Sequence, residues 1–430
     1  MADLLFKNAR VIDPSQRLDE VCDVLVADGK IKRVGRYLTE NAGPLKVIEA
    51  SGLILAPGLI DLHVHLRDPG FTQKEDIITG CNAAAAGGVT TLCAMPNTNP
   101  VCDNVETVKY IIEKAKTAKA RVLPIAAITK GQKGEELTDM QALKDAGACA
   151  FSDDGVPVKT ALLMKQAMET ACKLNLPIFA HCEEKSLAGN GIINEGVVAD
   201  EIGATGIPVS AEDVGTSREL ALLMSAPKGT RLHICHVSTK NSTGMISAAK
   251  QMGLLVTAET APHYFTYNED KIRLLDADYR MNPPLRTAKD QVSILYSLVD
   301  GTIDAIATDH APHTPEEKAD FLTSPNGVIG METSFSASYT ALVASGIISV
   351  SQLIRKMSTK PAKILGMNLG SLKVGSSADL ILIDENEKWT VDVNRLHGKS
   401  KNCIYKGKEL QSKIKMTVFG GKIVYNELGE

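Results

Sequence analysis

Residues 53–65 read LILAPGLIDLHVH, an apolar run that ends in polar and ionisable side chains. The part LILAPGLI is apolar on both faces, as expected of a strand buried in a parallel sheet. Strand side chains alternate, so one side of the carboxyl end carries Asp61, His63, His65 and Arg67. Two imidazoles so close together in an interior are costly unless they bind a metal ion. An exposed strand edge is the alternative, which the apolar run disfavours.

Seven further apolar segments follow and are separated mostly by amphipathic helical stretches, such as residues 104–118, 158–174 and 239–252. The predicted strands are GVTTLCAM (88–95), RVLPIAAI (121–128), ACAFSD (148–153), LPIFAHC (176–182), RLHICHVS (231–238), LLVTAET (254–260) and TIDAIATD (302–309). Eight strands in roughly 250 residues predict an α/β protein with a (β/α)8 TIM-like barrel. A doubly wound open sheet is the alternative, but it would carry a Gly-rich phosphate turn after its first strand, and the sequence has none there.

Both ends of the chain are β-rich, with hairpin signals at Asp28-Gly29 and Gly420-Gly421. We therefore predict that residues 1–52 and 365–430 are the two parts of a small β-sandwich domain and that residues 53–364 form the barrel. About 48 residues separate the fifth and sixth strands, enough for an extra helix or a cap over the barrel mouth. Within them, Ser210 and Asp213 predict a capping box that opens a helix through Met224.

The composition limits the class of protein. The chain has 430 residues, and its net charge of -4 argues against a nucleic-acid surface. No apolar run approaches the roughly 20 residues of a membrane-spanning helix, and the N-terminus has no signal-peptide pattern. The nine cysteines form no Cys-x-x-Cys pair, which favours reduced, buried thiols. We expect a cytoplasmic globular protein without nucleic-acid or membrane partners.

Eight of the nine histidines lie in the barrel region, most of them where a predicted strand ends. That is the end at which barrel enzymes place their chemistry. His181 and His236 end the fifth and sixth strands. His233 is three residues before His236, so on a regular strand the two side chains face opposite ways, and we expect His233 to pack or hydrogen-bond beneath the site. Asp153 and Asp154 end the fourth strand and Asp309 ends the eighth; a helix N-cap is an alternative role for Asp153. Together these positions predict a metal site.

A known family carries the same motifs in the same order: HVHLRDPG (63–70), GGVTT (87–91), MPNTNP (95–100), SDDG (152–155), AHCEE (180–184), HVST (236–239), MNPPLR (281–286) and DHAPHT (309–314). With them the chain resembles the amidohydrolase superfamily and, within it, dihydroorotases of the bacterial type I class. The resemblance spans essentially the whole chain. Any one motif would be weak, but eight in the right order are very specific.

The resemblance implies two zinc ions per subunit, bridged by Asp154 and a hydroxide. The other implied metal ligands are His63, His65, His181, His236 and Asp309, and Asp309 is also the implied catalytic residue that moves the proton. The implied substrate-binding residues are His65, Arg67, Asn97, Asn282, His313, Asn326 and Gly327. Many relatives use a carboxylated lysine as the bridge, and ACAFSDDG (148–155) contains no lysine. Asn326-Gly327 stands where relatives usually carry Phe-Gly.

The implied activity is the reversible cyclisation of N-carbamoyl-L-aspartate to L-dihydroorotate, in de novo pyrimidine (UMP) biosynthesis, by a homodimer. Another cyclic-amide hydrolase (a dihydropyrimidinase, hydantoinase or allantoinase) and a non-catalytic scaffold barrel are the alternatives. Histidine and carboxylate ligands also suit Mn, Fe or Co. The polar segment from His313 to Gly330 carries Pro and Gly and is a candidate lid.

Overall fold

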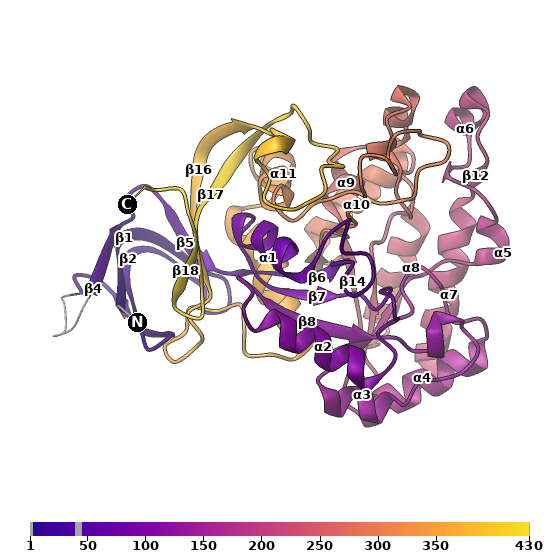
Figure 1. Ribbon diagram of the computed structural model, residues 1–430, viewed down its shortest axis with the longest axis horizontal. Helices are drawn as coiled ribbons and strands as arrows, with labels where there is room; N and C mark the ends of the chain where they lie inside the picture. The colour runs from indigo at the N-terminus through magenta and orange to yellow at the C-terminus, as the bar shows by residue number, and fades with distance from the viewer. Residues whose placement is uncertain (1–2, 39–44, 430) are drawn as a thin grey trace.

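The eight strands predicted for the middle of the chain form one parallel sheet in the computed structural model, which describes residues 3–38 and 45–429. Their order in the sheet follows the chain: β6 (Leu59–Val64), β7 (Val89–Ala94), β8 (Arg121–Ala126), β9 (Ala150–Phe151), β10 (Ile178–Ala180), β13 (Leu232–Ile234), β14 (Val256–Thr260) and β15 (Ala305–Ile306). Val64 pairs with His310, and the His65 amide donates to the His310 carbonyl at 2.8 Å. These contacts join the first strand to the segment after the last, and the predicted (β/α)8 barrel is confirmed (Figure 1).

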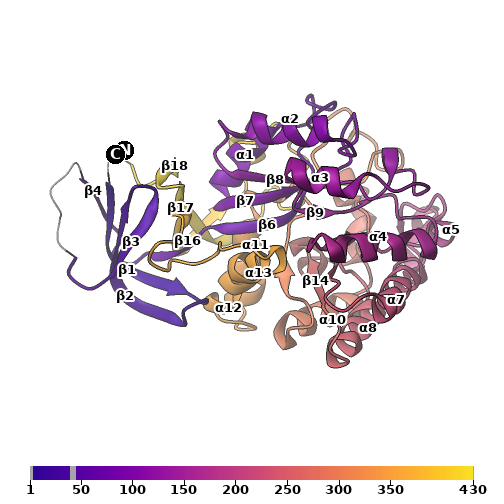
Figure 2. The same cartoon turned by 90° about the horizontal axis from the view of Figure 1, so that it is seen from below.

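Helices cover the outside of the barrel (Figures 1 and 2). The longer ones are α1 (Ile77–Ala86), α2 (Val105–Ala115), α3 (Met140–Ala146), α4 (Ala161–Lys173), α7 (Val209–Ser225), α8 (Lys240–Gln251) and α10 (Ala288–Asp300). The shorter ones are α5 (Lys185–Ala188), α6 (Val197–Ile202), α9 (Pro262–Thr266), α11 (Ser334–Ser338), α12 (Val350–Ile354) and α13 (Lys360–Leu365). Seven of the described helices begin after a residue whose side chain accepts the amide of the third helical residue, namely Asp76, Asn104, Asp139, Thr160, Thr239, Thr287 and Ser349. Such caps satisfy amides that have no partner within the helix.

The two chain ends form the second domain together, as predicted. Its sheet has the order β18-β17-β16-β5-β1-β2-β3, with β4 beside β1. The bounds are β1 (Asp3–Asp13), β2 (Leu18–Ala27), β3 (Lys30–Gly35), β4 (Leu45–Glu49), β5 (Ile54–Pro57), β16 (Leu380–Thr390), β17 (Glu409–Phe419) and β18 (Lys422–Asn426). Phe6, Val24, Leu382 and Met416 share one apolar cluster, so side chains from both ends of the chain make this core.

Both predicted hairpin turns are present, and they touch. Asp28 and Gly29 join β2 to β3, and Gly420 and Gly421 join β17 to β18, all four with positive φ. A Cβ on Gly421 would lie 2.6 Å from the Gly29 Cα. Glycine at these positions therefore permits both the left-handed turns and the close approach of the two chain ends.

Residues 53–65 contain two strands rather than one. β5 pairs with β1 and β16 in the small sheet, whereas β6 begins the barrel. The chain passes from one sheet to the other at Gly58, where a Cβ would lie 2.2 Å from Thr90 Oγ1. Periodicity could not show this change, because both strands are buried on both faces. The division at residues 52/53 and 364/365 stays a prediction.

The long connection between β10 and β13 holds α5, α6, α7 and the two-stranded sheet of β11 (Ile193–Asn194) and β12 (Gly206–Ile207). The capping box predicted at its last helix was wrong. α7 begins after Pro208, so Ser210 lies inside the helix, and Asp213 instead accepts from the Thr239 hydroxyl at 2.7 Å. The Asp213 carboxylate therefore binds Thr239, which is distant in sequence, and does not cap the start of α7.

The cysteines and the hydropathy of the helices can be compared with what the composition predicted. All nine cysteines are free thiols, eight of them buried, as predicted. Within residues 3–38 and 45–429, no helix has the length and hydropathy needed to cross a membrane.

Candidate active site

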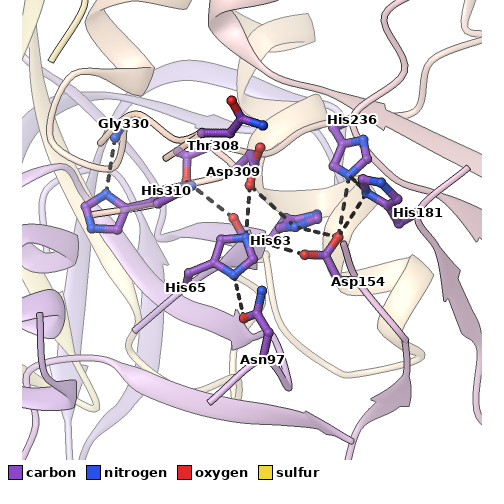
Figure 3. Close-up of polar contacts among 12 residues, drawn as sticks. His63, His65, Asn97, Asp154, His181, His236, Thr308, Asp309, His310 and Gly330 are labelled. Carbon is purple, nitrogen blue, oxygen red and sulfur yellow. Dashed lines mark hydrogen bonds and ion pairs between the residues drawn. The ribbon is translucent and has the colours of Figure 1, made fainter. Parts of the chain in front are cut away.

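The carboxyl ends of the barrel strands bring six of the predicted residues together (Figure 3). His63 lies on β6 and His65 directly after it, while the others follow β9, β10, β13 and β15. These are Asp154, His181, His236 and Asp309. All six side chains are buried, although the residues lie up to 246 positions apart in the sequence. The structure thus assembles the predicted ligand set, whose roles in metal binding stay a prediction.

Asp154 lies at the centre of this cluster. Its Oδ1 lies 3.4 Å from His63 Nε2 and 3.5 Å from both His181 Nδ1 and His236 Nε2. Its Oδ2 lies 3.5 Å from His65 Nε2. Two groups of possible ligand atoms, each within 4.8 Å of one another, therefore share Asp154: one with His63 and His65, the other with His181 and His236. A carboxylate shared by two such groups can bridge two cations.

The chemistry of these donors fits a metal centre. Within the described residues, His63 Nε2, Asp154 Oδ1 and His236 Nδ1 are buried and have no hydrogen-bond partner. Buried polar atoms are rarely left so, because desolvation without a partner is costly. Imidazole nitrogens and carboxylate oxygens are common ligands of zinc and related divalent ions. The residues present can therefore hold the metal cofactor of an amidohydrolase.

Ionisation states agree with this interpretation. Burial alone would raise the pKa of Asp154, but the imidazoles of His63, His181 and His236 outweigh it and hold that pKa well below its usual range. The pKa of Asp309 is also lowered. Burial raises this pKa, but the hydrogen bond from His65 and the charges of nearby histidines lower it by more. Both carboxyl groups are therefore ionised at neutral pH and can serve as ligands.

Three of the residues at this rim have a left-handed backbone. The φ angles are 34° at His236, 49° at Asp309 and 60° at Arg67. Residues with a Cβ rarely adopt this conformation, which costs about 1–3 kcal/mol each, and such strain clusters at active sites. Here it directs side chains inward directly after the strands end.

A cavity of about 240 Å³ opens over the cluster. Its lining includes most of the residues predicted to bind substrate, together with the metal-site residues except His63. The predicted residues that line it are His65, Arg67, Asn97, Asp154, His181, His236, Asn282, Asp309, Asn326 and Gly327. His63 lies beneath the cavity and is fully buried. His313 is not in the lining, but its Nε2 lies 3.3 Å from an Arg67 guanidinium nitrogen.

Arg67 and Asn97 lie on the same side of the site as His65. The Asn97 side-chain oxygen lies 2.8 Å from His65 Nδ1, which fixes the orientation of that ring. Arg67 donates through Nε to the Pro312 carbonyl at 3.2 Å. Burial lowers the pKa of Arg67 to about 10, against the opposing effect of Asp309, so the guanidinium stays charged at neutral pH. A buried cation of this shape is suited to a carboxylate.

Sequence reasoning missed two buried glutamates next to the predicted ligands. Glu183 lies 3.4 Å from His181 Nε2, accepts from the Asn282 amide at 3.1 Å and pairs with Lys185, which also lines the cavity. Glu259, at the end of β14, lies 3.1 Å from His63 Nδ1. The available signals were the position of Glu183 two residues after His181 and a charged residue inside the apolar segment 254–260.

Asp153 and His233, which were not assigned to the ligand set, both have contacts outside it. Asp153 is not an N-cap: it accepts from the Ile128 and Thr129 amides at 2.8 and 3.0 Å and so holds the loop after β8. His233 faces away from the cluster, as predicted, and its Nδ1 lies 2.8 Å from the Thr257 hydroxyl.

The predicted lid segment, from His313 to Gly330, contacts the body of the protein through Lys318. The Lys318 ammonium donates to the carbonyls of Ala277, Arg280 and Pro325 at 2.9, 3.2 and 2.9 Å. Asn326 accepts from Arg280 Nε at 3.1 Å. These contacts place Asn326 and Gly327 at the cavity, and movement of the segment on substrate binding stays a prediction.

Comparisons with known proteins agree with this fold and site. Residues 302–425 match the amidohydrolase family, and residues 52–242 match the dihydro-orotase-like family. The barrel and its histidine and carboxylate cluster thus define a metal-dependent cyclic amidohydrolase. The chain is 49% identical to a dihydroorotase of Geobacter metallireducens, over 98% of this chain and 99% of that protein. It is 45% identical to a dihydroorotase of Clostridioides difficile, over 98% and 100%. The chain belongs to the dihydroorotase family.

Solved structures of related enzymes have the same fold. An L-hydantoinase (dihydropyrimidinase) from Arthrobacter aurescens superposes with a TM-score of 0.89 at 25% identity, over 100% of this chain and 97% of that one. A D-hydantoinase from Thermus sp. gives a TM-score of 0.82 at 26% identity, over 99% and 97%. The architecture is therefore shared with hydrolases of other cyclic amides, and substrate choice depends on the residues of the cavity.

Proposed function

We propose that the chain interconverts N-carbamoyl-L-aspartate and L-dihydroorotate, the dihydroorotase reaction of de novo pyrimidine (UMP) biosynthesis. The observation that carries this proposal is the buried Arg67 in the lining of the same cavity as the metal-site cluster. L-Dihydroorotate is a cyclic amide with a carboxylate on its ring, and hydantoin and allantoin have none there. A guanidinium beside the reacting centre favours the substrate that carries the extra carboxylate.

Arg67 and Asn97 receive this carboxylate in the proposal, since both line the cavity beside His65. Asn282 lies across the cavity and is held by Glu183 through its amide nitrogen. Its side-chain oxygen is buried and has no hydrogen-bond partner in the described part of the chain. That oxygen can accept an N–H of the substrate ring, which would fix the ring between the two sides of the site.

Asp309 moves the proton. In the hydrolytic direction, the oxygen of water forms a bond to the ring carbonyl carbon, and the bond from that carbon to the ring nitrogen breaks. The Asp309 carboxylate takes a proton from the water and returns it to the departing nitrogen; ring closure is the reverse. When bound, the metal ions lower the pKa of water and polarise the carbonyl as Lewis acids.

A pair of zinc ions is the proposed cofactor. In this assignment His63, His65 and Asp309 would hold one ion, His181 and His236 would hold the other, and Asp154 would serve both. The sharing of Asp154 between two ligand groups supports the pair, while the choice of zinc over Mn, Fe or Co comes from the family resemblance. The family resemblance also supports a homodimer, and the cytoplasm is the proposed compartment.

A substrate panel tests the proposal. The zinc-loaded protein is incubated separately with L-dihydroorotate, hydantoin, dihydrouracil and allantoin. Ring opening is measured as a decrease in ultraviolet absorbance. We expect turnover of L-dihydroorotate, and cyclisation of N-carbamoyl-L-aspartate at lower pH. The structural similarity to hydantoinases makes hydantoin the most informative competitor. Efficient hydrolysis of hydantoin with none of L-dihydroorotate would refute the assignment.

A further inference from the structure

A buried carboxylate lies directly behind the metal-site cluster. Glu259, His63 and His233 each have no solvent-exposed surface. Glu259 Oε1 lies 3.1 Å from His63 Nδ1, and Glu259 Oε2 lies 3.1 Å from His233 Nε2. His233 Nε2 and Glu259 Oε2 are both buried, and neither has a hydrogen-bond partner within residues 3–38 and 45–429, so their 3.1 Å approach is a close polar contact. Glu259 therefore joins the two histidines.

The strand register produces this arrangement. β13 and β14 are parallel neighbours in which His233 pairs with Thr257. Thr257 and Glu259 are two residues apart on β14 and so project from the same face. As a result, the His233 ring lies between them, with Nδ1 2.8 Å from the Thr257 hydroxyl and Nε2 beside the Glu259 carboxylate.

The chemistry of the four groups assigns each proton. An ionised carboxylate only accepts hydrogen bonds, so the protons lie on His63 Nδ1 and on His233 Nε2. A neutral His233 with its proton on Nε2 has a lone pair on Nδ1, which accepts the Thr257 hydroxyl proton. His63 with its proton on Nδ1 likewise has a lone pair on Nε2.

The lone pair of His63 Nε2 points toward negative groups. His63 Nε2 lies 3.4 Å from Asp154 Oδ1 and 3.5 Å from Asp309 Oδ1. A lone pair directed at two carboxylates is repelled unless a proton or a metal ion lies between them. The proton order that Glu259 imposes is thus the one that a metal ion bound by His63 requires.

We infer that Glu259 is the positioning residue of the metal ligand His63 and that Thr257 and His233 fix the Glu259 carboxylate from behind. The inference rests on the metal centre of the proposed function but not on the identity of the substrate. Glu259 holds the Nδ1 proton of His63 and thereby aims Nε2 at the metal. Carboxylates behind a ligating histidine typically raise metal affinity about 10- to 100-fold.

The first test uses the unaltered, zinc-loaded protein labelled with ¹⁵N in its histidine rings. Long-range proton–nitrogen correlation spectra distinguish a protonated ring nitrogen from a bare one. We expect His233 to carry its proton on Nε2 alone and His63 to carry its proton on Nδ1 alone. A proton on His233 Nδ1 would overturn the inference, whether or not the protein turns over L-dihydroorotate.

The second test compares Glu259→Gln with Asp304→Asn. Asp304 is also a buried carboxylate, but it precedes β15 and pairs with Lys250 and Lys360, away from the predicted ligands. Zinc affinity is measured by competition with a chelator, and thermal stability is measured on the same samples. We expect Glu259→Gln to weaken zinc binding by about 10- to 100-fold and Asp304→Asn to lower only the melting temperature. Unchanged zinc affinity in Glu259→Gln, even with a lower melting temperature, would reduce Glu259 to a structural role.

If Glu259→Gln does not fold, Thr257→Val replaces it as the variant, since it keeps the volume of the side chain and removes the hydroxyl. Without that hydroxyl, the His233 ring loses one of its two contacts, but the Glu259 carboxylate still requires the proton on His233 Nε2. We therefore expect His233 to keep its proton on Nε2 alone and zinc affinity to fall less than the about 10- to 100-fold expected for Glu259→Gln. A proton on His233 Nδ1 in this variant would contradict the proposed proton order.

Discussion

The side chains of His65 and Asp309 meet across the junction that closes the barrel. His65 Nε2 lies 3.1 Å from Asp309 Oδ1, although the two residues are 244 positions apart. The contact exists because the first and last strands are neighbours, joined by the Val64–His310 pair. The site therefore depends on complete closure of the barrel.

Asp309→Asn tests the proton transfer. Asparagine keeps the shape of the side chain but cannot accept the proton, so we expect kcat to fall by about 10²- to 10⁴-fold. Metal content is measured on the same sample, because Asp309 is also a predicted ligand. Activity close to that of the unaltered protein would contradict the role of Asp309.

Arg67→Met tests the recognition of the carboxylate. Hydrogen bonds to charged groups contribute about 1.5–3 kcal/mol, so kcat/KM for L-dihydroorotate should fall by about 10- to 150-fold. Arg67→Lys, which restores the charge without the planar fork, should recover part of the loss. Arg231→Met is the matched control, because Arg231 donates to the Ile364 carbonyl at 3.2 Å and does not line the cavity. Equal losses in Arg67→Met and Arg231→Met would indicate a general effect of charge and not a specific contact.

Lys318→Met tests the attachment of the segment from His313 to Gly330. The substitution leaves three carbonyls without their common donor, so the segment should become mobile and Asn326 should lose its place at the cavity. We expect a higher KM and faster cleavage of this segment in limited proteolysis. Glu316→Gln, an exposed position in the same segment, serves as the control. The same cleavage rate in both variants would show that Lys318 does not hold the segment.

The pH dependence of stability reports on His313. Burial and the charges of Arg67 and Lys74 lower the pKa of His313 to about 3. Between its unfolded pKa of about 6.5 and this value, the unfolded chain takes up a proton that the folded chain does not. The stabilising contribution is therefore complete above pH 6.5 and is lost as the pH falls toward 3. We expect the melting temperature of His313→Asn to fall less steeply than that of the unaltered protein between pH 6.5 and 4; parallel curves would contradict the pKa.

The barrel could be predicted from the sequence because its strands are apolar runs that end in polar residues. β6 and β7, for example, are buried at every position. The change of sheet at Gly58 could not be predicted, because apolar periodicity does not identify the sheet to which a buried strand belongs. The capping box at Ser210 was wrongly predicted because the local pattern does not show tertiary contacts. The Asp213 carboxylate accepts a hydrogen bond from Thr239, which is near in space but distant in sequence.

The residues of the cluster could be expected because each lies at the carboxyl end of a strand or just after it, and such positions meet at one end of a barrel. Glu259 also ends a strand, β14, but it points beneath the cluster, and only the structure shows that it meets His63. Glu183 was hidden for another reason: its contacts with His181 and Asn282 depend on how the chain turns after β10. The supporting residues of the site were therefore less predictable than the ligands themselves.

In the proposed function, imidazoles and carboxylates from separate strands hold a pair of metal ions that share Asp154. The most direct measurement is the metal content of active protein purified without added metal, beside that of Asp154→Ala. We expect two zinc ions per chain in the active protein and the loss of both the metal pair and activity in the variant. Fully active protein that contains no metal, or an Asp154→Ala variant that keeps both ions, would contradict it.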